Sequence, residues 1–287
     1  MTKIGLVVEG GGMKCAYSAG VLDGFIDERI DFDYAVGVSA GGANMVSFLA
    51  HQRSRAARFY TTHIKEPHYF GFKSLLETGN LFGLQYIYGT LTNSDGGDPL
   101  DFEALMENPT DFHVVATDAA TGLPVYFPKS QMRKDDYREI MASCAIPVVS
   151  RPVKIGEHRY FDGGISDAIP VVKALEEGCD KIVVLSSKTR DYVKKPQKFR
   201  LLYRTTCFRY PEVVRAIRQR HIMYEIEQSY MYTLEKQGRA FLFNPSRNLK
   251  MGTYAMDVEA NRALYELGYS DFLEQKKALA EFLSENE

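Results

Sequence analysis

The segment Gly37-Val38-Ser39-Ala40-Gly41 directly follows a short apolar run, Phe32 to Val36. A serine between small residues, at a turn from a strand into a helix, is typical of a nucleophile elbow, where a strained backbone exposes the hydroxyl. The N-terminus of the helix that Gly41 would open favours negative charge beside the serine. The pattern therefore predicts that Ser39 is the nucleophile of an acyl hydrolase, with a purely structural glycine turn as the alternative.

A second glycine cluster, Gly10-Gly11-Gly12-Met13-Lys14, lies between an apolar run at Ile4 to Val8 and a helical pattern starting near Ala16. Backbone N–H groups in such a turn can stabilise the oxyanion of a tetrahedral intermediate. A dinucleotide loop is the alternative, but the GxGxxG spacing is missing and no acidic residue clearly ends a second strand about 20 residues on. Lys14 is predicted to steer an anionic substrate or stabilise the oxyanion region, unless it is a solvated lysine.

The composition is that of an ordinary globular protein. The chain has 287 residues, of which 45% are hydrophobic and 25% charged, enough for one large domain or one domain with an appendage. Its net charge of −2 gives no global bias toward nucleic acid. Four cysteines lack CxxC spacing and the density of a disulfide scaffold, so a cytoplasmic location is expected. The first apolar run is too short for a signal peptide, and no transmembrane helix is expected.

Apolar runs alternate with helical patterns, which predicts a mostly parallel α/β sheet covered by helices on both faces. The expected strands are Ile4 to Val8, Phe32 to Val36, Phe112 to Thr117, Val125 to Phe127, His158 to Phe161 and Ile182 to Ser186. The expected helices are Ala16 to Asp27, Gly42 to Gln52, Asp136 to Ala145 and Ile169 to Glu177. The third and fourth strands are close enough in sequence to form a hairpin.

Two regions fall outside this alternation. Residues 60–110 are rich in aromatic and turn residues, which favours a lid or cap over the active site. Beyond residue 190 the pattern is mainly helical. The expected elements there are helices at Pro211 to Lys236, Val258 to Leu267 and Asp271 to Ser284, and a strand at Ala240 to Phe243. We therefore expect a catalytic α/β core over residues 1–187, with 60–110 as its cap insertion, and a helical C-terminal extension over 188–287 packed on that core.

An activated serine needs a base, and none of the six histidines lies in a motif that would orient it toward Ser39. A carboxylate can serve instead if burial tunes its pKa. Asp162 is the best candidate, because Asp162-Gly163-Gly164 forms a tight turn directly after an apolar strand. The similar Asp95-Gly96-Gly97 lies among turn residues without a preceding strand, and is expected to be a loop, with a partial calcium site as the alternative.

These three motifs, in this order, resemble those of the patatin-like phospholipase family in its bacterial form. The segment Ala142-Ser143-Cys144-Ala145-Ile146-Pro147 also resembles the family's helix-to-loop segment, and the resemblance covers about residues 4–187. It implies a three-layer α/β/α fold and a Ser-Asp dyad that hydrolyses lipid acyl esters without a metal or another cofactor. Three ordered motifs make this resemblance more specific than the elbow alone.

The resemblance also implies roles for individual residues. Ser39 would be the nucleophile and Asp162 the base, while the N–H groups of Gly11 and Gly12 would stabilise the oxyanion. The remaining motif residues are Gly10 and Lys14 in the oxyanion loop, Gly37 and Gly41 in the elbow, and Gly163 and Gly164 in the aspartate turn. The family commonly has arginine then glycine where this chain has Lys14-Cys15, so a bidentate contact would become a point charge.

A basic segment follows the expected core. Residues 188–220 hold eleven basic and two acidic side chains, interleaved with aromatic and aliphatic ones. Basic and aromatic side chains together suit an anionic lipid surface, so peripheral contact with the inner membrane surface is one expectation. A solvated loop and helix face is the alternative, and no nucleic-acid module accompanies the charge.

The expected function is thus hydrolysis of a lipid acyl ester, of the phospholipase A or lysophospholipase type, through an acyl-enzyme on Ser39. A soluble carboxylesterase or thioesterase is the alternative within the enzymes. A catalytically idle module that binds lipid or regulates another protein is the alternative outside them. The substrate head group, the acyl length and the oligomeric state leave no recognisable pattern in this sequence.

Overall fold

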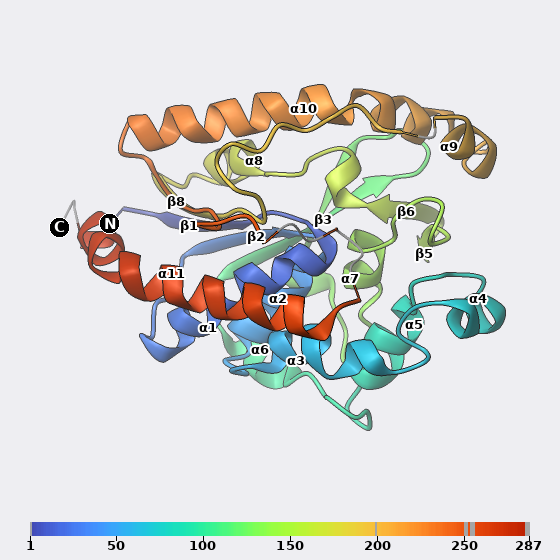
Figure 1. Cartoon of the computed structure of the whole chain (residues 1–287), viewed down its shortest axis with the longest axis horizontal. Helices are drawn as coiled ribbons and strands as arrows, with labels where there is room; N and C mark the ends of the chain where they lie inside the picture. The colour runs from blue at the N-terminus through green and yellow to red at the C-terminus, as the bar shows by residue number, and fades with distance from the viewer. Residues whose placement is uncertain (1, 199, 250–251, 253–255, 285–287) are drawn as a thin grey trace.

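Eight strands in the described part of the chain form one mixed sheet at the centre of the molecule (Figure 1). The computed structural model describes residues 2–198, 200–249, 252 and 256–284. The strands are β1 (Ile4–Val8), β2 (Tyr34–Val38), β3 (Asp111–Asp118), β4 (Pro124–Pro128), β5 (Val153–Ile155), β6 (His158–Asp162), β7 (Lys181–Leu185) and β8 (Ala240–Phe243). Their order is β5-β6-β3-β2-β1-β7-β8, and β4 also pairs with β3. Neighbouring strands in the run β3-β2-β1-β7-β8 are parallel. Strands β4 and β6 each pair antiparallel with β3, and β5 pairs antiparallel with β6.

The central strands are buried on both faces, as their apolar sequences require. In β1, Leu6 and Val8 pack into the core on one side of the sheet, while Val7 packs into the core on the other. All three are fully buried. Since successive side chains of a strand point to opposite faces, both faces of the sheet are covered at this strand. A strand without polar positions is therefore typical of a sheet sandwiched between helices.

Helices cover both faces and complete three layers (Figure 1). One face packs against α1 (Ala16–Asp27), α2 (Ala40–Leu49), α3 (Arg55–Thr61), α6 (Phe102–Glu107), α7 (Arg138–Ser143) and α11 (Val258–Ser284). The other packs against α8 (Val171–Glu176) and α10 (Pro211–Lys236). The predicted α/β/α sandwich with a mostly parallel sheet and a helical C-terminal region is confirmed.

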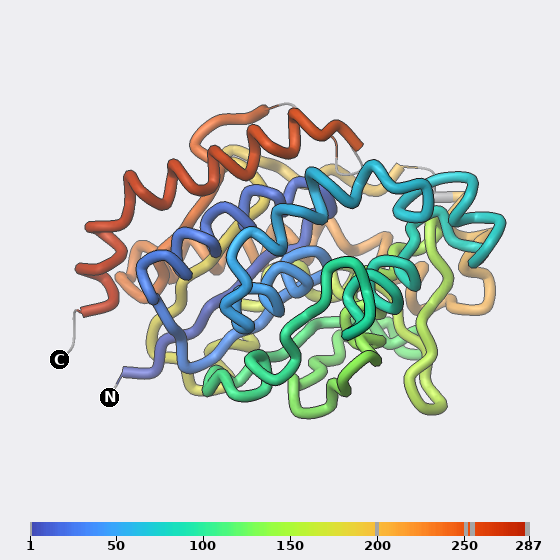
Figure 2. The backbone as a smooth tube through the Cα atoms, turned by 90° about the horizontal axis from the view of Figure 1, so that it is seen from below, coloured from blue at the N-terminus to red at the C-terminus, as the bar shows by residue number. Residues whose placement is uncertain are grey.

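Helix α11 runs beside α1 in both views (Figures 1 and 2). A Cβ added at Gly20 of α1 would lie 2.0 Å from the carbonyl oxygen of Tyr265, and one at Gly268 of α11 would lie 2.0 Å from that of Tyr17. Only glycine allows the two backbones to approach so closely. The two helices expected at 258–267 and 271–284 are therefore wrong in one respect: they form the single helix α11, with Gly268 inside it as a packing residue.

The segment between α2 and β3 contains short helices that the sequence pattern did not indicate. They are α3, α4 (Phe72–Thr78), α5 (Leu84–Tyr86), the π-helical turn Ile87–Leu91 and α6. Short 3-10 turns occur at Gly12–Cys15, His63–Lys65, Lys129–Gln131 and Gly163–Ile165. Outside that segment, the pattern also missed β5 and α9 (Arg200–Thr206). Elements of three to seven residues show too few turns or alternations for a periodic signal.

Candidate active site

Ser39 occupies a strained turn between β2 and α2. Its backbone has φ 53° and ψ −132°, a conformation that side-chain-bearing residues rarely adopt. The flanking glycines are required by close contacts, since a Cβ at Gly37 would lie 2.6 Å from the Cα of Gly42, and one at Gly41 would lie 2.5 Å from the carbonyl oxygen of Glu9. The turn thus has the geometry of a nucleophile elbow.

Asp162 meets Ser39 from the end of β6. The Ser39 Oγ donates a hydrogen bond of 2.6 Å to Asp162 Oδ2, although the two residues lie 123 positions apart. The other carboxylate oxygen, Oδ1, accepts from the backbone N–H of Gly164 at 2.8 Å. Gly163 packs so tightly that a Cβ there would lie 2.2 Å from the carbonyl oxygen of Val115. The Asp-Gly-Gly turn therefore fixes the carboxylate against the serine hydroxyl.

Burial changes the acid strength of this carboxylate. Asp162 is 5% exposed, and burial raises its pKa, an effect that the nearby Arg220 charge and the hydrogen bonds from Ser39 and Gly164 only partly offset. A raised pKa makes the carboxylate a stronger base, which suits proton abstraction from a hydroxyl. Asp162 thus has the position and the raised pKa that a base acting on the Ser39 hydroxyl would need.

The first glycine cluster lies directly beside the elbow. A Cβ at Gly10 would lie 3.1 Å from the Val38 carbonyl oxygen and 3.2 Å from the Cβ of Ser39. The N–H groups of Gly11 and Gly12 donate no hydrogen bond within the part of the chain that the structure describes. Unpaired N–H groups next to a nucleophile are available for a developing oxyanion.

Ser143 supports the elbow and was not singled out by the sequence. Its Oγ accepts a 2.7 Å hydrogen bond from the backbone N–H of Ser39 and donates one of 2.6 Å to the carbonyl oxygen of Val115. The side chain therefore connects the backbone of Ser39 to β3. The only sequence signal was its place in the segment Ala142–Pro147, which had been noted for its resemblance and not for a contact.

Two cavities meet at Ser39, and Gly12 and Ile146 also line both. The first, called here the apolar cavity, has an empty volume of about 620 Å³. Its walls include Met13, Phe59, Tyr60, Tyr69, Phe82 and Tyr88, most of them from the segment expected to be a cap. Its one charged lining residue, Arg55, is almost fully buried.

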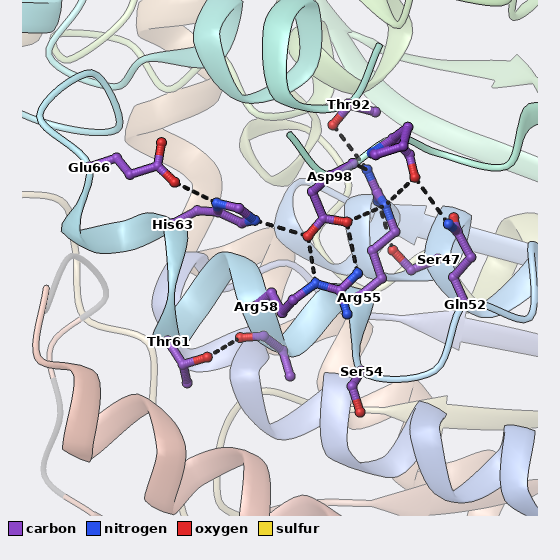
Figure 3. Close-up of polar contacts among 12 residues, drawn as sticks. Ser47, Gln52, Ser54, Arg55, Arg58, Thr61, His63, Glu66, Thr92 and Asp98 are labelled. Atoms are coloured by element: carbon purple, nitrogen blue, oxygen red, sulfur yellow. Dashed lines mark hydrogen bonds and ion pairs between the residues drawn. The ribbon is translucent and has the colours of Figure 1, made fainter. Parts of the chain in front are cut away.

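Arg55, which lines the apolar cavity, belongs to an ion-pair network with Asp98, Arg58 and His63 (Figure 3). Its Nε lies 3.4 Å from Asp98 Oδ1, and its Nη1 and Nη2 donate to Ser47 Oγ, Thr92 Oγ1 and the Asp98 carbonyl oxygen. Asp98 also accepts from Arg58 Nε at 2.6 Å and contacts His63 Nε2 at 2.9 Å. The arginine charge is therefore satisfied inside the protein.

The second, called here the cationic cavity, has an empty volume of about 1340 Å³. It contains both Ser39 and Asp162, and its walls include Lys188, Lys194, Lys195, Arg220, Tyr192 and Tyr224. Several cations of the basic segment 188–220 thus line the cavity of the dyad, which the sequence interpretation as a membrane or solvent surface did not anticipate. Charge density alone could not separate inward from outward side chains.

Lys14 lies apart from both cavities that contain Ser39. It lines a neighbouring recess with Ser187, Lys188 and Tyr192. Burial, and then the Lys188 charge, lower the pKa of its ammonium group. The structure therefore brings together Ser39, Asp162 and the glycine motifs, whereas Lys14 stands beside the cationic wall and not at the nucleophile.

Two further features bear on ligands and membranes. Within the described ranges, no three or more His, Cys, Asp or Glu side chains are grouped as a metal site would need. In the same part of the chain, no helix combines the length and apolar character required to cross a bilayer.

A Ser-Asp pair on a three-layer α/β/α fold, with a glycine loop at the serine, defines a class of hydrolase-like α/β proteins. A family model described as patatin-like phospholipase matches residues 6–175, and the chain belongs to this family. Membership implies a serine lipid acyl hydrolase. A second model, a domain of unknown function named DUF6363, matches residues 210–284.

The chain is also similar to two individual proteins. The Escherichia coli (strain K12) protein YjjU, described as uncharacterized, is 29% identical over 270 residues, which cover 93% of this chain and 75% of that protein. The crystal structure of VipD from Legionella pneumophila has a TM-score of 0.50 at 11% identity, covering 96% of this chain and 67% of that one. The second similarity concerns the fold alone.

Proposed function

We propose that this protein hydrolyses acyl esters of lipids, as a phospholipase A or lysophospholipase, with Ser39 as nucleophile and Asp162 as base. The observation that carries the proposal is the 2.6 Å hydrogen bond from Ser39 Oγ to Asp162 Oδ2 at the junction of an apolar and a cationic cavity. An ester of a fatty acid and a polar alcohol likewise has one apolar part and one polar part. The acyl chain would occupy the apolar cavity and the alcohol the cationic one.

The contacts support a two-step mechanism. Ser39 Oγ attacks the ester carbonyl carbon while its proton passes to Asp162, and the N–H groups of Gly11 and Gly12 stabilise the oxyanion. The tetrahedral intermediate then expels the alcohol, which takes the proton from Asp162. Water attacks the acyl-enzyme, again giving its proton to Asp162, and the collapse of the second intermediate returns that proton to Ser39 and frees the fatty acid.

The test compares two aspartates that each precede a Gly-Gly pair. Ser39→Ala and Asp162→Asn should lower kcat for every lipid ester by about a thousandfold or more, because each removes a member of the reacting pair. Asp95→Asn, in the exposed Asp95-Gly96-Gly97 loop, should keep the wild-type rate. Activity that survives both active-site changes would contradict the dyad.

Labelling separates an enzyme from an idle lipid-binding module. A fluorophosphonate reacts only with an activated serine, so the wild-type chain should be labelled and Ser39→Ala should not. Folded wild-type protein without label would favour the binding module. A panel of oxygen esters and thioesters would then distinguish a lipase from a thioesterase.

The same proposal includes contact with an anionic lipid surface. Val193, Leu201 and Phe208 are about 70% exposed in and near α9, within the basic segment. Val193 also lines the cationic cavity, so this apolar surface adjoins the cavity of the dyad. Helix α4, with Phe72 equally exposed, lies at the same end of the molecule (Figures 1 and 2). Exposed apolar side chains among cations suit a membrane surface.

Vesicle flotation tests this contact. The full chain should bind vesicles that contain anionic phosphatidylglycerol, and less so as salt is raised. Leu201→Ser combined with Phe208→Ser should reduce binding. Leu273→Ser, which changes a leucine of α11 that is 52% exposed, is the matched control. Equal loss in the control would show that this surface has no special role.

A further inference from the structure

Three cations of the cationic cavity form no ion pair with a carboxylate among the described residues: Lys195, which is exposed, and Lys194 and Arg220, which are partly buried. Lys194 Nζ lies 4.7 Å from the centre of the Tyr224 ring, and Arg220 Nε donates to the carbonyl oxygen of Gly164, but neither forms an ion pair there. Burial, then the Arg220 and Lys188 charges, lower the pKa of Lys194 to about 7. Glu9 and Asp162 act on Lys194, and Asp162 on Arg220, at longer range than an ion pair, so a directly bound anion would stabilise both cations further.

The carboxylates of the same cavity are already occupied. Glu9 Oε2 accepts hydrogen bonds from Ser186 Oγ at 2.6 Å and from Ser187 N at 2.8 Å. Its Oε1 accepts from Tyr224 at 2.9 Å and lies 3.4 Å from Lys188 Nζ. Asp162 is bonded to Ser39 and Gly164. A positively charged ligand would therefore find repulsion and no free carboxylate.

We propose that Lys194 and Arg220 form a subsite for a phosphomonoester on the alcohol side of the substrate. The enzyme would then select acyl esters with a dianionic head group over esters with a zwitterionic or neutral one. This inference rests on the proposed function. The two partly buried cations match the charge of the dianion, and guanidinium and ammonium groups both bind phosphate through charge-assisted hydrogen bonds. A choline or ethanolamine ammonium would be repelled by these two cations.

The proposal also gives a role to the C-terminal part of the chain. Lys194 and Arg220 both follow the family match, which ends at residue 175, and Arg220 lies within the domain of unknown function. Helix α10 brings Arg220 to the carbonyl of Gly164, two residues from the base. The C-terminal region would thus complete the substrate site that the catalytic motifs begin.

Direct binding tests the subsite without any catalytic step. Isothermal titration calorimetry on the full wild-type chain would compare glycerol 3-phosphate, glycerophosphocholine and inorganic phosphate. Glycerol 3-phosphate should bind at least about tenfold more tightly than glycerophosphocholine, and Lys194→Gln should weaken it about tenfold. Lys236→Gln, which removes an exposed cation at the end of α10, should leave its affinity unchanged.

Each outcome decides the proposal. Equal affinity for the two glycerol derivatives, or an unchanged affinity in Lys194→Gln, would overturn it. Inorganic phosphate bound as tightly as glycerol 3-phosphate would also overturn it, in favour of a free-phosphate site. Arg220→Gln should weaken glycerol 3-phosphate as well, and circular dichroism would confirm that the variant is folded.

Kinetics separate this inference from the function on which it rests. The ratio of kcat/KM for 1-acylglycerol 3-phosphate to that for 1-monoacylglycerol should fall about tenfold in Lys194→Gln and stay constant in Lys236→Gln. A wild-type chain that hydrolyses neither ester refutes the proposed function, and the binding data still decide the subsite. Hydrolysis of both esters without preference refutes the subsite alone.

Discussion

The two cavities that meet at Ser39 differ in whether all the cations that line them are paired with a carboxylate of the protein. In the apolar cavity, the charged lining residue Arg55 is held by Asp98 and by hydroxyl and carbonyl oxygens of the protein. In the cationic cavity, neither Lys194 nor Arg220 forms an ion pair among the described residues, and Arg220 donates only to the carbonyl oxygen of Gly164. A cation that is paired with a carboxylate of the protein stabilises the cavity wall, whereas a cation without an ion pair is available to a ligand. Similar side chains therefore have a structural role in the apolar cavity and, in our proposal, a ligand-binding role in the cationic cavity.

The largest effect should follow from breaking the satisfied network. Asp98→Asn leaves Arg55 buried without its counter-charge, and breaking a buried ion pair costs about 3–5 kcal/mol. We expect a loss of this size in the free energy of unfolding measured with urea. The affinity for glycerol 3-phosphate in the other cavity should stay the same. Asp95→Asn, an exposed neighbour in sequence, should change stability by less than about 0.5 kcal/mol.

The next largest effect should be an equal loss of kcat for phosphate esters and for neutral esters. A Cβ at Gly11 would lie 2.3 Å from Ser187 Oγ and 2.8 Å from Ser187 Cβ, so we expect Gly11→Ala to push the glycine loop and Ser187 apart beside Ser39. Losing an oxyanion donor lowers kcat by about a hundred- to a thousandfold. Phosphate and neutral esters should lose activity alike. Gly97→Ala, whose Cβ would make only an ordinary 3.4 Å contact with Leu91, is the control. A loss confined to one ester class would show that Gly11 serves a subsite and not the oxyanion.

The sequence indicated the pairing of Ser39 with Asp162 better than the lining of either cavity. Strands β1 and β8 and helices α1 and α10 coincide with their expected ranges, because long periodic or wholly apolar segments carry a strong signal. The strand before the elbow was placed two residues early, since Phe32 is buried although it precedes β2. Ser39 and Asp162 could be singled out because strand-end motifs mark them.

The cavity walls could not be predicted in the same way. They depend on contacts between segments far apart in the chain, such as Arg220 with Gly164 or Arg55 with Asp98. No local pattern shows that one lysine of a basic segment turns inward while its neighbour faces solvent. Direction and burial arise only once the sheet and its helices are assembled.

A moderate effect should follow from filling the apolar cavity. Ala56 of α3 lines this cavity and is nearly buried, so Ala56→Leu should shorten the space for an acyl chain. Each methylene forced out of an apolar site costs about 0.8 kcal/mol, and two would lower kcat/KM for long-chain esters roughly tenfold. A short-chain ester measured on the same variant is the control. An equal loss for both chain lengths would indicate a distorted elbow and not a filled cavity.

The smallest expected effect is a pH dependence of KM, which tests the difference in charge between the two cavities. The protonated form of Lys194 binds an anion, and its pKa of about 7 is set by burial and by the facing charges of Arg220, Lys188, Glu9 and Asp162. As pH rises from 7 to 9 the ammonium loses its proton, while a phosphomonoester stays dianionic because its second pKa is about 6. KM for the phosphate ester should therefore rise about threefold, by less than full titration would give, because the bound anion raises the pKa of Lys194. KM for the neutral ester should stay flat, and in Lys194→Gln the rise should disappear. Parallel curves for both esters would place the titration at the shared dyad, and the two cavities would then no longer differ in their use of charge.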